Sequence, residues 1–180
     1  FFELKQCEGN SFPLSKIDTQ ITMRFATEVA CDILDKDCSG YDFFYTITAN
    51  SAIVGGPSAG AAATVLTVAI LDNQVLSNDT IMTGTINSGN LIGPVAGVPA
   101  KAAAAQLAGY KRVLIPKWDS VNNTPNSDLK IEVIPVTTLE DALRYFTGKD
   151  YSVPVDVLNG KIHSEEYNAM TEVITGMLLS

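Results

Sequence analysis

The stretch Gly55-Gly56-Pro57-Ser58-Ala59-Gly60 marks the point where an apolar, strand-like run ends and an apolar, helix-like run begins. The first run is Ile53-Val54, and the second covers residues 61–76. A serine framed by small residues at such a turn has an uncrowded hydroxyl, and its backbone N–H lies near the positive end of a helix. The arrangement suits an acyl-transfer nucleophile, and it suits equally well a serine that only caps a helix.

Composition and charge exclude some classes of protein. The chain has 180 residues, of which 46% are hydrophobic, so it can bury one sizeable core. Its net charge is −8 and its Lys and Arg residues form no cluster, which argues against binding to nucleic acid. The chain begins with Phe1 rather than Met, so we expect a piece of a longer protein.

Three cysteines, Cys7, Cys31 and Cys38, lie in the first quarter of the chain. They lack the paired close spacing of a zinc site. The sequence alone allows two alternatives: one disulfide with one free thiol, or three reduced thiols.

Alternation and helical spacing predict a mixed α/β chain. Residues 18–34 are expected to form a helix that begins at the N-cap Asp18, and residues 41–48 to form a half-buried strand. The core face of that helix is expected to carry the apolar residues that recur every fourth position, which are Ile17, Ile21, Phe25, Val29 and Ile33.

The remaining elements follow from turn and cap signals. We expect a buried helix over 59–76, then strands over 80–86 and 91–95 joined by a turn at 87–90. A helix over 98–107, strands over 112–115 and 131–136, and a helix opened by a Thr137–Glu140 capping box follow. Residues 1–150 are expected to form the main domain, and 151–180 an extension of the same globular unit with a docking helix.

The form Gly-x-Ser-x-Gly is also found at the nucleophile of α/β-hydrolases, in which an acid and then a histidine follow along the chain. His163 is the only histidine, and three aspartates precede it in the required order: Asp128, Asp141 and Asp156. However, the neighbours Glu165 and Glu166 are typical of a solvated helix start. The chain is also short for that fold, and no His-Gly-Gly oxyanion segment precedes Ser58.

A lysine can replace histidine as the base if it is neutral at the working pH. Lys101 lies in the first turn of an expected helix, where the macrodipole disfavours an ammonium, and four alanines follow it. Acids are the usual residues in a first turn, so a lysine here marks a candidate functional site. An ordinary surface lysine is the competing interpretation.

Four ordered blocks of this sequence resemble the proteolytic domain of the Lon proteases. They are 56–60 (Gly-Pro-Ser-Ala-Gly), 82–84 (Met-Thr-Gly), 93–102 (Gly-Pro-Val-Ala-Gly-Val-Pro-Ala-Lys-Ala) and 113–116 (Val-Leu-Ile-Pro). The separation of Ser58 from Lys101 is similar to the family's nucleophile-to-base separation. The resemblance covers roughly residues 15–147, and it implies the Lon-type α/β (α+β) fold with mixed sheets and packed helices.

The resemblance implies a serine endopeptidase with a Ser/Lys dyad. Ser58 would be the nucleophile, Lys101 the general base, and Thr83 the residue that orients Lys101. The nucleophile turn and oxyanion region would be formed by Gly56, Pro57, Ala59 and the Ser58 N–H. No cofactor or metal is implied. Polypeptide substrates, a homo-oligomeric ring, and a membrane anchor or partner outside this chain are implied as partners.

Two departures from the family's pattern accompany this resemblance. Gly55 stands where Lon domains commonly carry an acidic residue, and Ala96-Gly97 replaces the usual Gly-Gly. The chain contains no Gly-x-x-x-x-Gly-Lys-Ser/Thr sequence, so it binds no ATP by that route. It is therefore similar to stand-alone Lon-like proteases, described mainly from archaea. That type implies a membrane-associated or extracytoplasmic location, with the cytoplasm as the alternative.

Two other functions remain open on the sequence. One is the histidine-dependent hydrolase with His163, and the other is a catalytically silent binding or scaffold domain that kept the fold. A Lys101 nitrogen within hydrogen-bond reach of the Ser58 hydroxyl favours the dyad, whereas His163 in that place favours the hydrolase.

Overall fold

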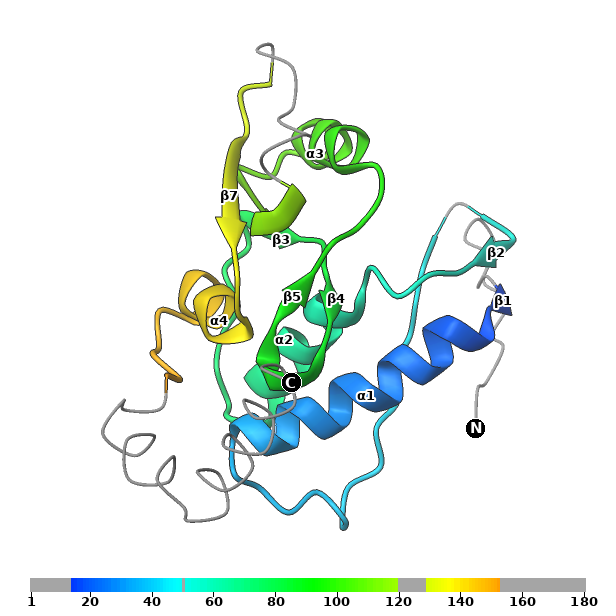
Figure 1. Ribbon diagram of the computed structural model, residues 1–180, viewed down its shortest axis with the longest axis vertical. Helices are drawn as coiled ribbons and strands as arrows, with labels where there is room; N and C mark the ends of the chain where they lie inside the picture. The colour runs from blue at the N-terminus through cyan, green and yellow to red at the C-terminus, as the bar shows by residue number, and fades with distance from the viewer. Residues whose placement is uncertain (1–13, 50, 120–128, 153–180) are drawn as a thin grey trace, which may run out of the picture. The chain divides into compact units, whose positions relative to one another are not determined.

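The computed structural model describes residues 14–49, 51–119 and 129–152 (Figure 1). The chain divides into two compact units, Phe1–Asp150 and Tyr151–Ser180. The predicted tail helix at 164–179 lies outside the described residues, so its docking stays a prediction. All elements below belong to the first unit, which has the predicted mixed α/β class.

A three-stranded parallel sheet forms one part of this unit. Its strands lie in the order β3 (Thr80–Met82), β6 (Arg112–Pro116) and β7 (Glu132–Val136). Helix α3 (Val98–Leu107) packs on it and buries an apolar cluster of Val98, Ala102, Ala105, Val113, Ile115 and Ile131. Because the strands are parallel, the residues that follow them, including Thr83 and Lys117, lie at the same edge of the sheet.

Two long helices and two small sheets form the other part (Figure 1). Helix α1 (Ile17–Ile33) packs along α2 (Gly60–Leu71), whose sequence is apolar nearly all round. Strand β1 (Leu14–Ser15) pairs in parallel with β2 (Ile53–Val54), just before the glycine-rich turn. Strands β4 (Thr85–Ile86) and β5 (Ile92–Gly93) form an antiparallel hairpin closed by η1 (Ser88–Asn90). The last helix, α4 (Leu139–Thr147), contacts α2 and β7.

The buried face of α1 differs from the predicted one. Ile17 and Ile21 are 70% and 59% exposed, whereas the buried positions are Thr19, Thr22, Met23, Ala26, Val29, Ala30 and Cys31. Most of these side chains are small, because α1 approaches α2 closely. A Cβ added at Gly60 would stand 2.9 Å from Thr22 Cγ2. The close packing of α1 on α2 therefore buries the small side chains of α1, while the larger isoleucines at its start are exposed to solvent.

The start of α1 also differs from the prediction. The N-cap is Lys16, with no side-chain cap, and Asp18 lies inside the first turn. The Asp18 carboxylate accepts a hydrogen bond from the Thr19 N–H, and it also accepts one from Gly56 N, 38 residues away. An acid that looks like a local cap thus binds a distant loop instead.

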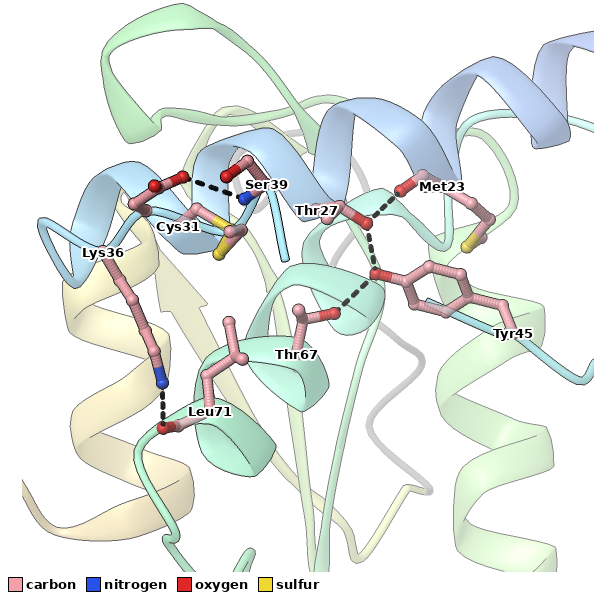
Figure 2. Close-up of a disulfide and its surroundings, with 10 residues drawn as sticks. Met23, Thr27, Cys31, Lys36, Ser39, Tyr45, Thr67 and Leu71 are labelled. Atoms are coloured by element: carbon pink, nitrogen blue, oxygen red, sulfur yellow. Dashed lines mark hydrogen bonds between the residues drawn. A yellow bond between two sulfur atoms is a disulfide. The ribbon is translucent and has the colours of Figure 1, made fainter. Parts of the chain in front are cut away.

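Residues 41–48 form no strand, although the side chains at 43, 45 and 47 are half-buried and those between them are exposed. The alternation reflects packing against helices, since Tyr45 and Ile47 lie against Met23, Ala26 and Ala63. Figure 2 shows the Tyr45 hydroxyl between Thr27 of α1 and Thr67 of α2, at 2.8 and 2.7 Å. An extended segment can therefore show a strand's burial pattern without a ladder partner.

A disulfide joins Cys31, near the end of α1, to Cys38 in the loop that follows (Figure 2). This resolves the pairing that the sequence left open for these two cysteines, while Cys7 lies outside the described residues. The bridge closes a short loop and holds the start of the extended segment that carries Tyr45.

Three predicted boundaries are shifted. Helix α2 ends at Leu71 rather than at residue 76. The predicted strand 80–86 breaks at Thr83 and Gly84, where it leaves the sheet and passes the nucleophile turn. The capping box of α4 pairs Thr138 with Asp141, one residue later than predicted, because Thr138 is the residue with extended backbone before the helix. Helix α3 has the predicted bounds.

Candidate active site

The two glycines of the Gly56–Gly60 turn are needed for different reasons. Gly56 has a φ of +101°, which side-chain-bearing residues rarely adopt. Its N–H donates to Asp18 Oδ2 at 3.0 Å, and its carbonyl accepts from the Thr19 hydroxyl at 3.4 Å. Gly60 leaves room for the close approach of Ile86 and Thr22. The first turn of α1 and the β4 strand therefore hold the loop on both sides of Ser58.

Ser58 is held by its backbone, and its side chain is free. The Ser58 carbonyl accepts hydrogen bonds from Gly84 N at 3.0 Å and from the Thr83 hydroxyl at 3.3 Å. Within the described residues, the Ser58 hydroxyl makes no hydrogen bond, and neither do the N–H groups of Ser58 and Ala59. The N-cap of α2 is Ala59, with no side-chain cap, so Ser58 does not serve as a helix cap.

These free N–H groups lie at the start of the 12-residue helix α2. That helix is mostly buried, but Leu66 and Ile70 are exposed, so the prediction of a buried helix is wrong for that face. The N-terminus of a helix carries a partial positive charge and unsatisfied N–H donors. A negatively charged oxygen that develops beside Ser58 is therefore stabilised by donors that the fold holds in place.

Lys101 is the fourth residue of α3, and its side chain extends to the end of β3. Its Nζ donates a hydrogen bond to Thr83 Oγ1 at 3.1 Å. Burial lowers the pKa of Lys101 below its usual value, and the carboxylate of Asp119 opposes this by raising that pKa. The first turn of α3 contains no acidic residue that would hold the ammonium in its charged form.

Thr83 connects the lysine to the serine. It is only 7% exposed, and its N–H donates to Leu114 O of β6 at 3.1 Å. Because its one hydroxyl hydrogen is directed to the Ser58 carbonyl, its oxygen is left to accept from Lys101. A neutral lysine amine that donates one N–H to Thr83 Oγ1 still has its lone pair available to accept a proton.

We expect the Thr83 hydroxyl to be necessary for full activity. Thr83→Val keeps the shape of the side chain but removes both hydrogen bonds, which frees the Lys101 amine and should lower kcat on the order of 10²-fold. Thr83→Ser restores the hydroxyl and should lie within about threefold of the wild type. Peptide hydrolysis by the two variants, with matching melting curves, checks this. Equal activity in both would show that the hydroxyl has no part in the reaction.

The structure brings Ser58, Thr83 and Lys101 into one connected group, but the Ser58 hydroxyl and Lys101 Nζ form no hydrogen bond there. Of the histidine and the aspartates of the alternative hydrolase, the structure describes only Asp141. His163, Asp128 and Asp156 lie outside the described residues, and Asp141 is used in the cap of α4.

Gly55, where an acid was expected from the family's pattern, lies beside the side chain of Lys16. A Cβ at position 55 would contact the Lys16 methylene groups, so any side chain there would have to displace them. The turn instead binds the carboxylate of Asp18 in α1, through the Gly56 N–H.

Asp119 is a site residue that the sequence reasoning missed. It lies in η2 (Lys117–Asp119), directly after β6, and the sequence showed it only as one acid in a polar loop. Its position in the sequence, directly after a buried strand, is the signal that could have identified it. An acid that directly follows a buried parallel strand lies at the same edge as Thr83.

Among the described residues, no group of His, Cys, Asp and Glu side chains could hold a metal ion. No helix of the described part is long and apolar enough to cross a membrane.

Comparison with models of protein families matches residues 41–147, more than half of the chain, to the Lon protease (S16) C-terminal proteolytic domain. A search of curated proteins finds no match. The family match begins after α1 and covers the Ser58, Thr83 and Lys101 positions together with Asp119.

Proposed function

Since the chain belongs to the Lon protease (S16) C-terminal proteolytic domain family, which is a serine peptidase family acting on polypeptides, we propose that it is an endopeptidase with Ser58 as nucleophile and Lys101 as general base. The observation that carries the proposal is the chain of hydrogen bonds from Lys101 Nζ through Thr83 Oγ1 to the Ser58 carbonyl. The chain contains no Gly-x-x-x-x-Gly-Lys-Ser/Thr sequence, so the proposed steps use no ATP bound to this chain by that motif.

In the first step, the Ser58 hydroxyl transfers its proton to the neutral Lys101 amine while Ser58 Oγ attacks the carbonyl carbon of the scissile peptide. The developing oxyanion is bound by the N–H groups of Ser58 and Ala59 at the start of α2. The tetrahedral intermediate then breaks its C–N bond. The Lys101 ammonium gives its proton to the leaving amine, and an ester on Ser58 remains.

In the second step, water attacks the Ser58 ester and gives a proton to Lys101. The second tetrahedral intermediate breaks the bond to Ser58 Oγ, which takes the proton back from Lys101, and the new carboxyl terminus leaves. Lys101 thus returns to its neutral form. Its lowered pKa favours that form, because burial disfavours the ammonium.

The proposal requires the Ser58 hydroxyl and the Lys101 amine to meet. Catalytic hydrogen bonds are often absent or long before substrate binds, and they form in the substrate complex. Here Thr83 already connects the Lys101 amine to the Ser58 carbonyl, so both residues of the proposed dyad contact the same hydroxyl group.

Labelling with a peptidyl fluorophosphonate tests the proposal. The folded protein should form one covalent adduct, located on Ser58 by mass spectrometry of its peptides. The adduct should form faster as the pH rises, because a neutral Lys101 activates the hydroxyl. The unfolded protein is the control, and it should not react at Ser58. A folded chain that never reacts at Ser58 would favour the silent scaffold domain instead.

A further inference from the structure

Asp119 is buried, and among the described residues it has no cationic hydrogen-bond partner. It is 8% exposed, and its Oδ2 accepts a hydrogen bond from the Val95 N–H at 2.8 Å. Burying a carboxylate costs free energy unless it is hydrogen-bonded or placed near a positive charge. Retaining this acid at the edge of the sheet therefore calls for a role.

The partner of Asp119 lies in the segment that leads into α3. Val95 follows β5, and only Ala96 and the N-cap Gly97, with a φ of +72°, separate it from the first residue of the helix. Lys101 N donates to the Gly97 carbonyl at 3.0 Å. The Asp119 hydrogen bond therefore fixes the backbone that sets where α3 begins, and with it the base of the Lys101 side chain.

Asp119 is also the charge that acts on Lys101. The other charged residues on the strands next to α3 lie toward the opposite edge of the sheet. Lys111 and Arg112, at the start of β6, are paired with Asp79, and Glu132 begins β7. Lys117 lies in η2 with Asp119. Of these groups, only the Asp119 carboxylate raises the pKa of Lys101.

We propose that Asp119 is a positioning residue of the dyad, whose carboxylate fixes the Val95 backbone ahead of α3 and supplies the negative charge that faces Lys101. This inference rests on the proposed role of Lys101 as base. It means that two opposing influences set the strength of that base. Burial makes Lys101 easier to deprotonate, and Asp119 limits this effect, so that the amine keeps enough basicity to take the Ser58 proton.

Asp119→Asn separates the two functions of the carboxylate. The amide oxygen still accepts the Val95 N–H, but the charge is lost. Without that charge the Lys101 ammonium is less stable, so the Lys101 pKa should fall. The rise of kcat/KM with pH should therefore move to lower pH. Maximal activity should stay within about threefold, because the positions of the groups are kept.

Asp119→Ala removes the hydrogen bond as well. It should show the same direction of pH shift together with a loss of kcat of about tenfold or more, since the segment ahead of α3 is released. The difference between the Asn and Ala variants at their optimal pH measures the positioning role. Equal losses of kcat in both variants, with no pH shift in either, would reduce Asp119 to a structural residue and overturn the proposal.

A titration that does not depend on activity keeps this test separate from that of the proposed function. The protein is labelled with ¹³C at lysine Cε, and the Lys101 resonance is assigned by its loss in Lys101→Met. Its pKa is then measured in the wild type and in Asp119→Asn. A lower pKa in the variant supports the inference even if peptide hydrolysis fails, and an unchanged or higher pKa overturns it even in an active enzyme.

Discussion

Ser58→Ala is expected to abolish peptide hydrolysis, with kcat lower by a factor on the order of 10⁴ to 10⁶. The variant has no oxygen that could attack the peptide carbonyl or form the ester. Its stability should be unchanged, because the hydroxyl makes no hydrogen bond within the described residues and Ser58 is held through its carbonyl. Steady-state hydrolysis of a peptide substrate and thermal unfolding together check the prediction.

A matched control is Ser51→Ala, in the segment just before β2. The Ser51 hydroxyl is exposed, donates to the Ile53 carbonyl at 2.8 Å and accepts from the Ile53 N–H at 3.4 Å, so its loss is local and should leave kcat unchanged. Hydrolysis by Ser58→Ala at a tenth or more of the wild-type rate would exclude Ser58 as the nucleophile. His163→Ala adds a second control, because only the histidine-dependent hydrolase predicts that this variant is inactive.

Lys101→Met is expected to lower kcat on the order of 10²-fold to 10⁴-fold, the usual contribution of a general base. Methionine keeps an unbranched side chain but cannot accept the Ser58 proton. Lys101→Arg should be as inactive, because a guanidinium keeps its proton at any accessible pH. Lys111→Met is the matched control. The Lys111 side chain is exposed and its ammonium lies 3.7 Å from Asp79 Oδ2, away from the proposed site, so kcat should be retained.

The change of kcat/KM with pH tests whether Lys101 acts as the base. The base works only when neutral, so kcat/KM of the wild type should rise as pH increases through the Lys101 pKa, which burial places below the ordinary lysine value. The residual activity of Lys101→Met should lack this rise. A wild-type rate that does not change from mildly acidic to strongly basic pH would contradict the assignment of Lys101 as the base.

The same lowered pKa predicts the direction of the stability change. At neutral pH the unfolded chain holds the Lys101 proton more firmly than the folded chain, so this group lowers the free energy of unfolding until the pH rises past the unfolded pKa. Replacing the lysine with methionine removes that cost. Lys101→Met should therefore be at least as stable as the wild type near pH 7, which separates its loss of activity from unfolding.

Elements defined by local chemistry were predictable. Helix α3 has the predicted bounds because Pro99 near its start and Gly109 past its end act through their own backbones. The β4–β5 hairpin follows from its turn residues in the same way. The ordered blocks around Ser58, Thr83 and Lys101 identified the family, which the family match confirms over residues 41–147.

Elements that depend on distant partners could not be predicted from the sequence. Alternation at 41–48 indicates burial, but a strand also needs a neighbour with free backbone groups, and here helices α1 and α2 occupy that place. Ile17 and Ile21 have the spacing of a core face, but the close approach of α2 accepts only small side chains. Asp18 has the position of a cap, but it binds Gly56.

The sequence by itself determined the chemistry available to this protein: a serine at a helix start, a lysine without acidic neighbours in its first turn, and a threonine between them in the chain. These follow from residue type and short spacing. Only the tertiary structure decided that Thr83 connects Lys101 to the Ser58 backbone and that the Asp119 carboxylate raises the pKa of the same lysine. The physical reason is that burial and charge act through space, and residues at the ends of separate parallel strands meet only when the sheet has formed.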